Sequence, residues 1–165
     1  MPSVYLIGFM GSGKTSIGKL LSAKLKMPFF DTDELIIKKA GKTIPQIFND
    51  SGEAYFRGLE SAVISEIALA KNGVVSVGGG AVINPDNWRQ IQNSGTTVYL
   101  QWPLEVLQQR IINDKNRPLV STAAELKKLF ETRQNNYKKA DVTIDCSEGM
   151  SPEQIVDQII KLIKR

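Results

Sequence analysis

Short runs of apolar residues alternate along this chain with stretches in which apolar positions recur at the spacing of an amphipathic helix. The short runs predict five β-strands, at residues 4–7, 29–30, 74–77, 97–100 and 142–144. The helical spacing is clear after the first run and near the last residue, in Ile17, Leu20, Leu21, Leu25, Ile155, Ile159 and Ile163. Because strands and helices alternate, we expect parallel strands joined by crossover helices, a three-layer α/β sandwich forming one domain over residues 1–165.

Two segments interrupt this alternation. Residues 33–62 carry helical patterns in place of a single crossover helix, which predicts a substrate-binding insertion. Residues 112–121 are polar, charged and aperiodic between two helical stretches, which predicts a lid. Proline marks three expected helix starts, which are Asn84-Pro85, Trp102-Pro103 and Ser151-Pro152.

The composition narrows the classes of function. The chain has no histidine and one cysteine, Cys146, which excludes an intramolecular disulfide, a zinc finger and any site that depends on imidazole. Its formal charge of +4 comes without a long basic run, so phosphate or carboxylate ligands fit better than nucleic acid. With no signal sequence and no run near the ~18 apolar residues of a membrane span, we expect a cytoplasmic protein, and we expect it to be a monomer.

The strongest motif follows the first predicted strand. The sequence Gly-Phe-Met-Gly-Ser-Gly-Lys-Thr at residues 8–15 matches the phosphate-binding pattern G-x-x-x-x-G-K-S/T and opens an amphipathic helix. In such a loop the backbone N–H groups surround a phosphate, Lys14 reaches the β- and γ-phosphates, and the Thr15 hydroxyl binds Mg²⁺. A dinucleotide-binding loop would need glycine where Ser16 stands, and the guanine-reading motif Asn-Lys-x-Asp is absent. A small kinase fits best.

Two aspartates follow the second predicted strand. Strand alternation places Asp31 and Asp33 on one face at its carboxyl end, where open α/β sheets bind ligands. One carboxylate would then serve Mg²⁺ and the other a substrate hydroxyl. The alternative is that Asp33 only caps the following helix.

Charged residues also fall on apolar helix stripes. Glu53, Arg57 and Glu60 are spaced i, i+4 and i+7 on a helix predicted from about residue 51 to residue 70. A surface ion pair is one reading, but Glu60 shares its stripe with apolar residues and could hold a guanidinium for a ligand carboxylate. Arg133 likewise lies on an apolar stripe, where it either points inward or snorkels to the surface.

Three consecutive glycines, Gly78, Gly79 and Gly80, end the third predicted strand. Backbone amides can approach a ligand closely there, and a plain turn is the alternative.

Taken together, these motifs resemble those of the shikimate kinase family, and the resemblance covers the whole chain. The shared motifs, in order, are the phosphate loop, Asp31-Thr32-Asp33, the block from Phe48 through Gly52-Glu53 and Phe56-Arg57 to Glu60, the three glycines, Arg117-Pro118-Leu119, and Arg133-x-x-x-Tyr137. The resemblance implies a P-loop kinase fold like that of nucleoside monophosphate kinases, with a five-stranded parallel sheet in the order 2-3-1-4-5. It also implies ATP-dependent phosphorylation of the 3-hydroxyl of shikimate, a step of the chorismate pathway to aromatic amino acids.

The resemblance also implies residue roles. On the acceptor side, Asp33 binds and deprotonates the hydroxyl, while Arg57 and Arg133 hold the shikimate carboxylate. The other implied acceptor contacts are Phe48 on the ring, Glu60 beside Arg57, and Gly79 and Gly80 at the ring hydroxyls.

On the nucleotide side, the resemblance implies that Arg117 in the lid reaches the phosphates and that Arg110 stacks on adenine. Asp31 would hold Mg²⁺ through water, beside Thr15. The implied catalytic residues are Lys14, Asp33 and Arg117, and the implied ATP-binding residues are Gly11, Ser12, Gly13, Lys14, Thr15, Ser16, Arg110 and Arg117. One departure is that residues 146–150 lack the basic residue that some members place beside adenine.

Three other functions stay open. A nucleoside monophosphate kinase would bring a phosphate next to Asp33, which would repel it. A gluconate-type or other small-molecule kinase is harder to exclude from charge alone. A kinase-fold regulator without turnover is the third, although Lys14, Asp33 and Arg117 are all present.

Overall fold

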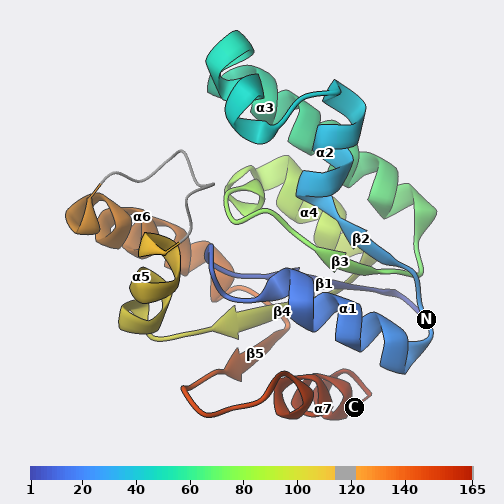
Figure 1. Cartoon of the computed structure of the whole chain (residues 1–165). Helices are drawn as coiled ribbons and strands as arrows, with labels where there is room; N and C mark the ends of the chain where they lie inside the picture. The colour runs from blue at the N-terminus through green and yellow to red at the C-terminus, as the bar shows by residue number, and fades with distance from the viewer. Residues whose placement is uncertain (114–121, 165) are drawn as a thin grey trace.

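The computed structural model describes residues 1–113 and 122–164, in which helices and strands alternate along the chain (Figure 1). The elements are β1 (Ser3–Ile7), α1 (Lys14–Leu25), β2 (Phe29–Asp31), α2 (Thr32–Ala40), α3 (Ile44–Ala70), β3 (Val74–Ser76), the 3₁₀ turn η1 (Ala81–Ile83), α4 (Pro85–Ser94), β4 (Gly95–Gln101), α5 (Leu104–Ile112), α6 (Ala123–Tyr137), β5 (Val142–Asp145) and α7 (Pro152–Ile163).

The five strands form one parallel sheet in the order β2-β3-β1-β4-β5, which confirms the predicted order. Helices α1 and α7 pack together on one side of the sheet, and α3 and α4 pack together on the other (Figure 1). The central strand β1 is buried along its whole length, as expected for a strand covered on both faces. The crossovers from β1 and β3 leave in opposite directions, so the carboxyl end of β1 opens into a crevice between their loops.

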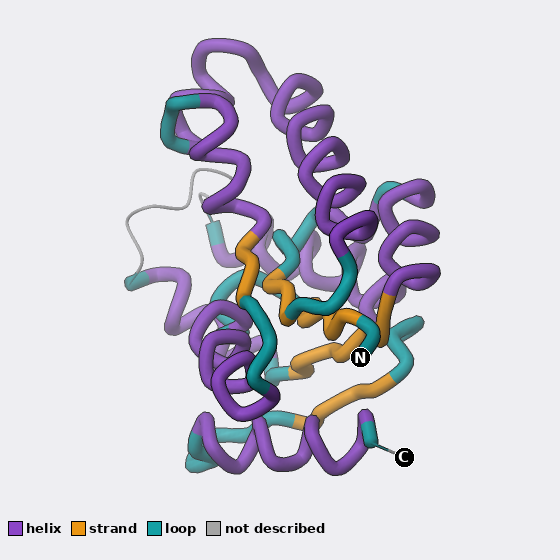
Figure 2. The backbone as a smooth tube through the Cα atoms, turned by 90° about the vertical axis from the view of Figure 1, so that its right-hand side faces the viewer, coloured by secondary structure: helices purple, strands orange, loops and turns teal. Residues whose placement is uncertain are grey.

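The predicted insertion contains α2 and the first part of α3, which rise above the edge of the sheet at β2 (Figures 1 and 2). Helix α3 begins at Ile44, where Thr43 and Gln46 form a capping box, but its second part starts just after Gly52, close to the helix start expected near residue 51. Gly52 interrupts α3 with φ 83° and ψ 174°, a backbone conformation that favours glycine. The expected boundary is therefore a bend within α3.

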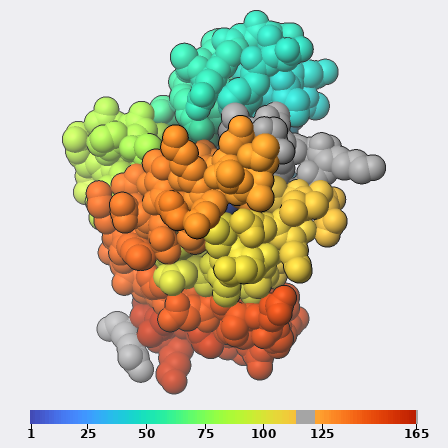
Figure 3. Space-filling model, turned by 90° about the vertical axis from the view of Figure 1, so that its left-hand side faces the viewer, coloured from blue at the N-terminus to red at the C-terminus, as the bar shows by residue number. Residues whose placement is uncertain are grey.

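The other predicted helix starts agree with the structure. Asn84 and Ser151 cap α4 and α7 through their side chains, and Pro103 occupies the N-cap position of α5. Helices α5 and α6 lie side by side on one face of the molecule (Figure 3). Most of the predicted lid, residues 114–121, lies outside the described residues. Within the described part of the chain, no helix combines the length and the apolar character needed to cross a membrane.

Helix α1 can lie close to the sheet because Gly18 faces it. A Cβ atom at Gly18 would lie 2.5 Å from Cε2 of Phe29 on β2. Gly58 in α3 is exposed, and a Cβ atom there would meet nothing within 4 Å.

We predict that Gly18→Ala lowers the free energy of unfolding by about 1–3 kcal/mol, because the Phe29 ring must move. The matched control Gly58→Ala should raise it by about 0.5–1 kcal/mol, the usual gain of alanine over glycine inside a helix. Urea denaturation of both variants measures the difference. Equal shifts in the two variants would show that α1 does not pack this closely.

Candidate active site

The phosphate loop between β1 and α1 is folded around its own lysine. Lys14 Nζ donates hydrogen bonds to the carbonyl oxygens of Gly8 at 2.8 Å and Phe9 at 3.1 Å. Gly11 and Gly13 have φ values of 80° and 83°, which favour glycine. Gly13 is also the N-cap of α1 and supplies no side-chain cap, so the first turn of α1 presents backbone N–H groups suited to an anion.

Two side chains outside the phosphate loop donate hydrogen bonds to its backbone. Trp102 Nε1 donates to the Ser12 carbonyl oxygen at 2.9 Å, and Arg110 Nη1 donates to the Gly11 carbonyl oxygen at 2.9 Å. The Arg110 guanidinium also lies 4.2 Å from the centre of the Trp102 ring, a cation–π contact. No pattern in the sequence predicts this role of Trp102, because an isolated tryptophan beside a helix start gives no signal of a loop contact.

Arg110, which the resemblance placed on adenine, lines a hollow of about 450 Å³ with Trp102, Glu148 and Gly149. The segment after β5 therefore does reach this hollow. It contributes Glu148, a residue that bears a carboxylate.

Asp31 and Asp33 both line one cavity of about 410 Å³ with the phosphate loop, but not for the reason that the sequence suggested. Strand β2 ends at Asp31, so Asp33 lies in the first turn of α2 and not on the strand. Asp31 is the residue that caps α2, with Oδ1 accepting from the N–H groups of Asp33 at 2.9 Å and Glu34 at 3.3 Å. The strand placement of Asp33 and the alternative that Asp33 is the cap are both wrong, because the helix begins sooner than the apolar pattern indicates.

Thr15 and Asp31 are the residues predicted for Mg²⁺, and they lie together. Thr15 Oγ1 donates to Asp31 Oδ2 at 2.8 Å. A hydroxyl and a carboxylate are hard oxygen donors, which match the preference of Mg²⁺ and of its bound waters. The residues present therefore fit this ion.

The three glycines after β3 lie where charged groups converge. A Cβ atom at Gly78 would lie 3.0 Å from Glu60 Oε2 and 3.1 Å from Asp33 Oδ1. A Cβ atom at Gly79 would lie 3.3 Å from Arg133 Nη1. None of the three glycines has a positive φ, so the local need is for space and not for an unusual backbone conformation.

Gly80 lies against both predicted carboxylate-binding arginines. A Cβ atom there would lie 2.7 Å from Arg57 Nη1 and 2.9 Å from Arg133 Nη2. Arg133 is only 6% exposed, so the snorkelling alternative is wrong. Arg57, Glu60, Gly80 and Arg133 line a second cavity, of about 350 Å³.

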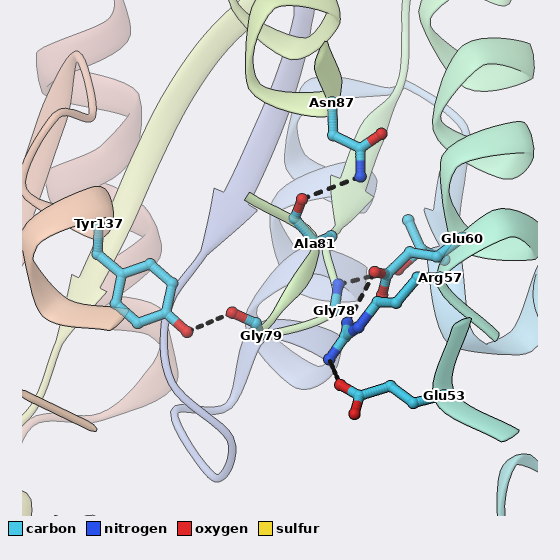
Figure 4. Close-up of polar contacts among 9 residues, drawn as sticks. Glu53, Arg57, Glu60, Gly78, Gly79, Ala81, Asn87 and Tyr137 are labelled. Carbon is cyan, nitrogen blue, oxygen red and sulfur yellow. Dashed lines mark hydrogen bonds and ion pairs between the residues drawn. The ribbon is translucent and has the colours of Figure 1, made fainter. Parts of the chain in front are cut away.

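Arg57 forms two ion pairs of different kinds (Figure 4). Glu60 is 1% exposed, and its Oε1 accepts from Arg57 Nη1 at 2.8 Å. The partner on the other side is Glu53, an exposed residue whose Oε1 lies 3.6 Å from Nη2. The surface-pair reading therefore fits Glu53 but not Glu60.

Burial raises the pKa of Glu60 above its ordinary value of 4.5. The positive charge of Arg57 and its hydrogen bond lower that pKa, the nearby Asp33 carboxylate raises it, and Arg133 lowers it slightly.

Two predicted residues stand apart from these cavities. Phe48 packs on Phe56 with ring centres 4.8 Å apart, and it lines a shallower hollow with Gln46 and Asn49. Its contact with a substrate ring stays a prediction. Arg117 lies outside the described residues, so its role also stays a prediction.

Comparison with known proteins gives a consistent result over nearly the whole chain. The sequence model of the shikimate kinase family matches residues 10–164. The shikimate kinase of Persephonella marina is 45% identical over 165 residues, covering 99% of this chain and 100% of that protein. The structure of Acinetobacter baumannii shikimate kinase in complex with shikimate superposes with a TM-score of 0.94 at 37% identity, covering 99% of this chain and 93% of the other.

A gluconokinase from Sinorhizobium meliloti is also similar in structure, with a TM-score of 0.61, 17% identity, and coverage of 99% of this chain and 92% of the other. At that identity the likeness shows a shared fold only.

We predict that Arg57→Met raises the pKa of Glu60 further, since it removes the cation that lowers it most. A raised pKa means that the folded protein keeps the Glu60 proton to a higher pH than the unfolded chain does, so stability falls as pH rises through that pKa. The variant should therefore lose more stability at pH 7, about 1–3 kcal/mol, than at pH 5. Denaturation at both pH values measures this.

The control is Arg89→Met, which breaks an exposed pair with Asp86. This variant should lose little stability, and the same amount at pH 5 and at pH 7. A loss in Arg57→Met that does not depend on pH would contradict the role of Glu60 as a buried charge.

Proposed function

This chain belongs to the shikimate kinase family, and we propose that it transfers the γ-phosphoryl group of ATP to the 3-hydroxyl of shikimate, giving shikimate 3-phosphate and ADP. The observation that carries the proposal is the convergence of two arginines, Arg57 and Arg133, on Gly80 beside the cavity that holds the phosphate loop. A hydroxy acid has a carboxylate that the two arginines can bind and a hydroxyl that can accept the phosphoryl group from the side of the phosphate loop.

On the nucleotide side, the loop N–H groups and Lys14 bind the phosphates. Lys14 already lies over the loop, where it neutralises an incoming negative charge. Arg110 provides a flat guanidinium surface for adenine, supported on its other side by Trp102. Arg117 is proposed to reach the phosphates and to stabilise the charge that develops during transfer.

Thr15 and Asp31 are the residues that would hold Mg²⁺, Asp31 through water. When bound, this ion neutralises charge on the β- and γ-phosphates. The hydrogen bond between Thr15 and Asp31 keeps the two oxygens in one orientation.

On the acceptor side, Arg57 and Arg133 bind the carboxylate. A guanidinium can bind a carboxylate through two parallel hydrogen bonds, and the buried Glu60 fixes the direction in which Arg57 presents its remaining N–H groups. Phe48 is proposed to pack on the ring. The N–H groups of Gly79 and Gly80 are proposed to bind ring hydroxyls.

Asp33 accepts the proton of the attacking hydroxyl. Its side chain is half-buried in the cavity that also holds Lys14, and it lies near Gly78 at the boundary with the arginine side. Asp33 can therefore contact the 3-hydroxyl while the arginines hold the other end of the substrate. Phosphoryl transfer depends mainly on such positioning and on charge stabilisation.

We further propose that the protein is a cytoplasmic monomer. Cys146 is a free and buried thiol, as is common in reducing compartments, and ATP is supplied there. Analytical ultracentrifugation of the full chain measures the oligomeric state.

A coupled assay of ADP release tests the function. We expect turnover with shikimate, and little with nucleoside monophosphates, because Asp33 repels an acceptor phosphate. Gluconate is assayed in parallel as the competing hydroxy acid. The products are checked by mass, since ADP release without a phosphorylated acid would be ATP hydrolysis alone. Preferred turnover of gluconate would overturn the assignment of the acceptor, and ATP binding without any turnover would indicate a regulator.

Asp33→Asn should lower kcat by about 10²–10⁴-fold, because the hydroxyl loses its proton acceptor, while ATP affinity survives. The matched control is Glu34→Gln, which removes one negative charge from the same helical turn at an exposed position. Steady-state kinetics and calorimetry of ATP binding measure both effects. Near wild-type turnover in Asp33→Asn would remove Asp33 from the reaction.

A further inference from the structure

The backbone of the glycine loop, residues 78–81, is held by side chains from three helices (Figure 4). From α2, Thr32 Oγ1 accepts from the Gly78 N–H at 2.9 Å. From α4, Asn87 Nδ2 donates to the Ala81 carbonyl oxygen at 3.0 Å. The family resemblance gave no role to Thr32 or Asn87.

The third anchor comes from α6, where the Tyr137 hydroxyl donates to the Gly79 carbonyl oxygen. The loop also bonds to itself, because the N–H of Ala81 donates to the Gly78 oxygen at 3.0 Å and the N–H of Ile83 donates to the Gly80 oxygen at 3.3 Å. The backbone N–H groups of Gly79 and Gly80 donate no hydrogen bond to any other residue in the described part of the chain. Buried or partly buried backbone donors rarely stay unpaired, so these two are available to a ligand.

The bond from Tyr137 determines where one of these donors points. A trans peptide is planar, and its C=O and N–H point in opposite directions. Fixing the Gly79 carbonyl toward α6 therefore turns the Gly80 N–H away from α6.

Tyr137 lies beside the arginine one helical turn before it. A Cβ atom at Gly79 would lie 3.3 Å from Arg133 Nη1 and 3.4 Å from the Tyr137 hydroxyl oxygen. The hydroxyl that donates to Gly79 and the guanidinium of Arg133 therefore lie against the same piece of backbone. The spacing of four residues on α6 is what lets both side chains face the loop.

The surroundings keep this hydroxyl in its protonated form. Tyr137 is fully buried and packs on Tyr99 with ring centres 5.3 Å apart. Burial raises the pKa of Tyr137 far above its ordinary value, and the Arg133 charge lowers it only in part. The hydroxyl therefore remains a hydrogen-bond donor at physiological pH.

We propose that Tyr137 is a positioning residue for the acceptor site, whose hydroxyl fixes the Gly79–Gly80 peptide beside the Arg133 guanidinium. Arg133 then meets the carboxylate of a hydroxy acid while the Gly80 N–H meets one of its polar groups. The inference rests on the proposed function, because it assumes that a hydroxy acid binds between them.

The test compares Tyr137→Phe with Tyr5→Phe. Tyr5 is an equally buried tyrosine whose hydroxyl pairs with Ser94 Oγ at 2.6 Å, outside both site cavities. Each substitution removes one buried hydroxyl, so both variants should lose comparable stability in thermal melts. We expect only Tyr137→Phe to raise the KM for shikimate, by about five- to tenfold, with kcat and the KM for ATP within about twofold of wild type.

A double-mutant cycle with Arg133→Lys gives a second measurement. Because the peptide that Tyr137 fixes lies against Arg133, the two side chains are neighbours at one site, and the double variant should weaken shikimate binding by less than the product of the single effects. Equal shikimate KM values in Tyr137→Phe and Tyr5→Phe, or equal shifts of the shikimate and ATP KM values in Tyr137→Phe, would overturn the inference. Failure of the wild-type protein to phosphorylate shikimate would instead overturn the proposed function, so the two failures are distinguishable.

Discussion

The site depends on a stretch of backbone that carries no side chains. At each of Gly78, Gly79 and Gly80, a Cβ atom would come within 3.3 Å of a carboxylate or guanidinium atom. Their backbone conformations need no glycine, so the constraint is one of space. This loop follows the short interior strand β3, which pairs with β2 and with β1. The rigid sheet therefore places the loop where α2, α3 and α6 bring their charged groups together.

Burying Glu60 at this point has a cost that its partner must offset. A carboxylate that loses its hydration is destabilised by several kcal/mol, and breaking a buried pair leaves that cost uncompensated. The bond from Arg57 at 2.8 Å opposes the effect of burial, whereas the Asp33 carboxylate adds to it. The pair is therefore better explained as a way to orient Arg57 than as a source of stability. The exposed Glu53, by contrast, adds little to the orientation of Arg57 or to the stability of the fold.

The five strands and the phosphate loop could be predicted from the sequence because periodicity and a fixed motif determine them locally, whereas the strand order followed only from the family resemblance. The placement of Asp33 could not, since a three-residue strand gives too short an alternation to show that the helix had begun. Burial of Glu60 was foreseen from its apolar stripe. The positions of Trp102 and Tyr137 depend on contacts between segments 90 and 58 residues apart, which no local pattern encodes.

The charges around the loop suggest why the acceptor is a hydroxy acid. Asp33 and Glu60 carry two negative charges and Arg57 and Arg133 two positive ones, so these four groups are balanced before any ligand binds. A substrate carboxylate adds one negative charge to this site, and the proton that passes from the hydroxyl to Asp33 leaves that total unchanged. An acceptor phosphate would add about two negative charges instead of one, in a site where burial strengthens every electrostatic interaction. A monocarboxylate with a hydroxyl at its far end thus matches both the charge and the spacing of the site.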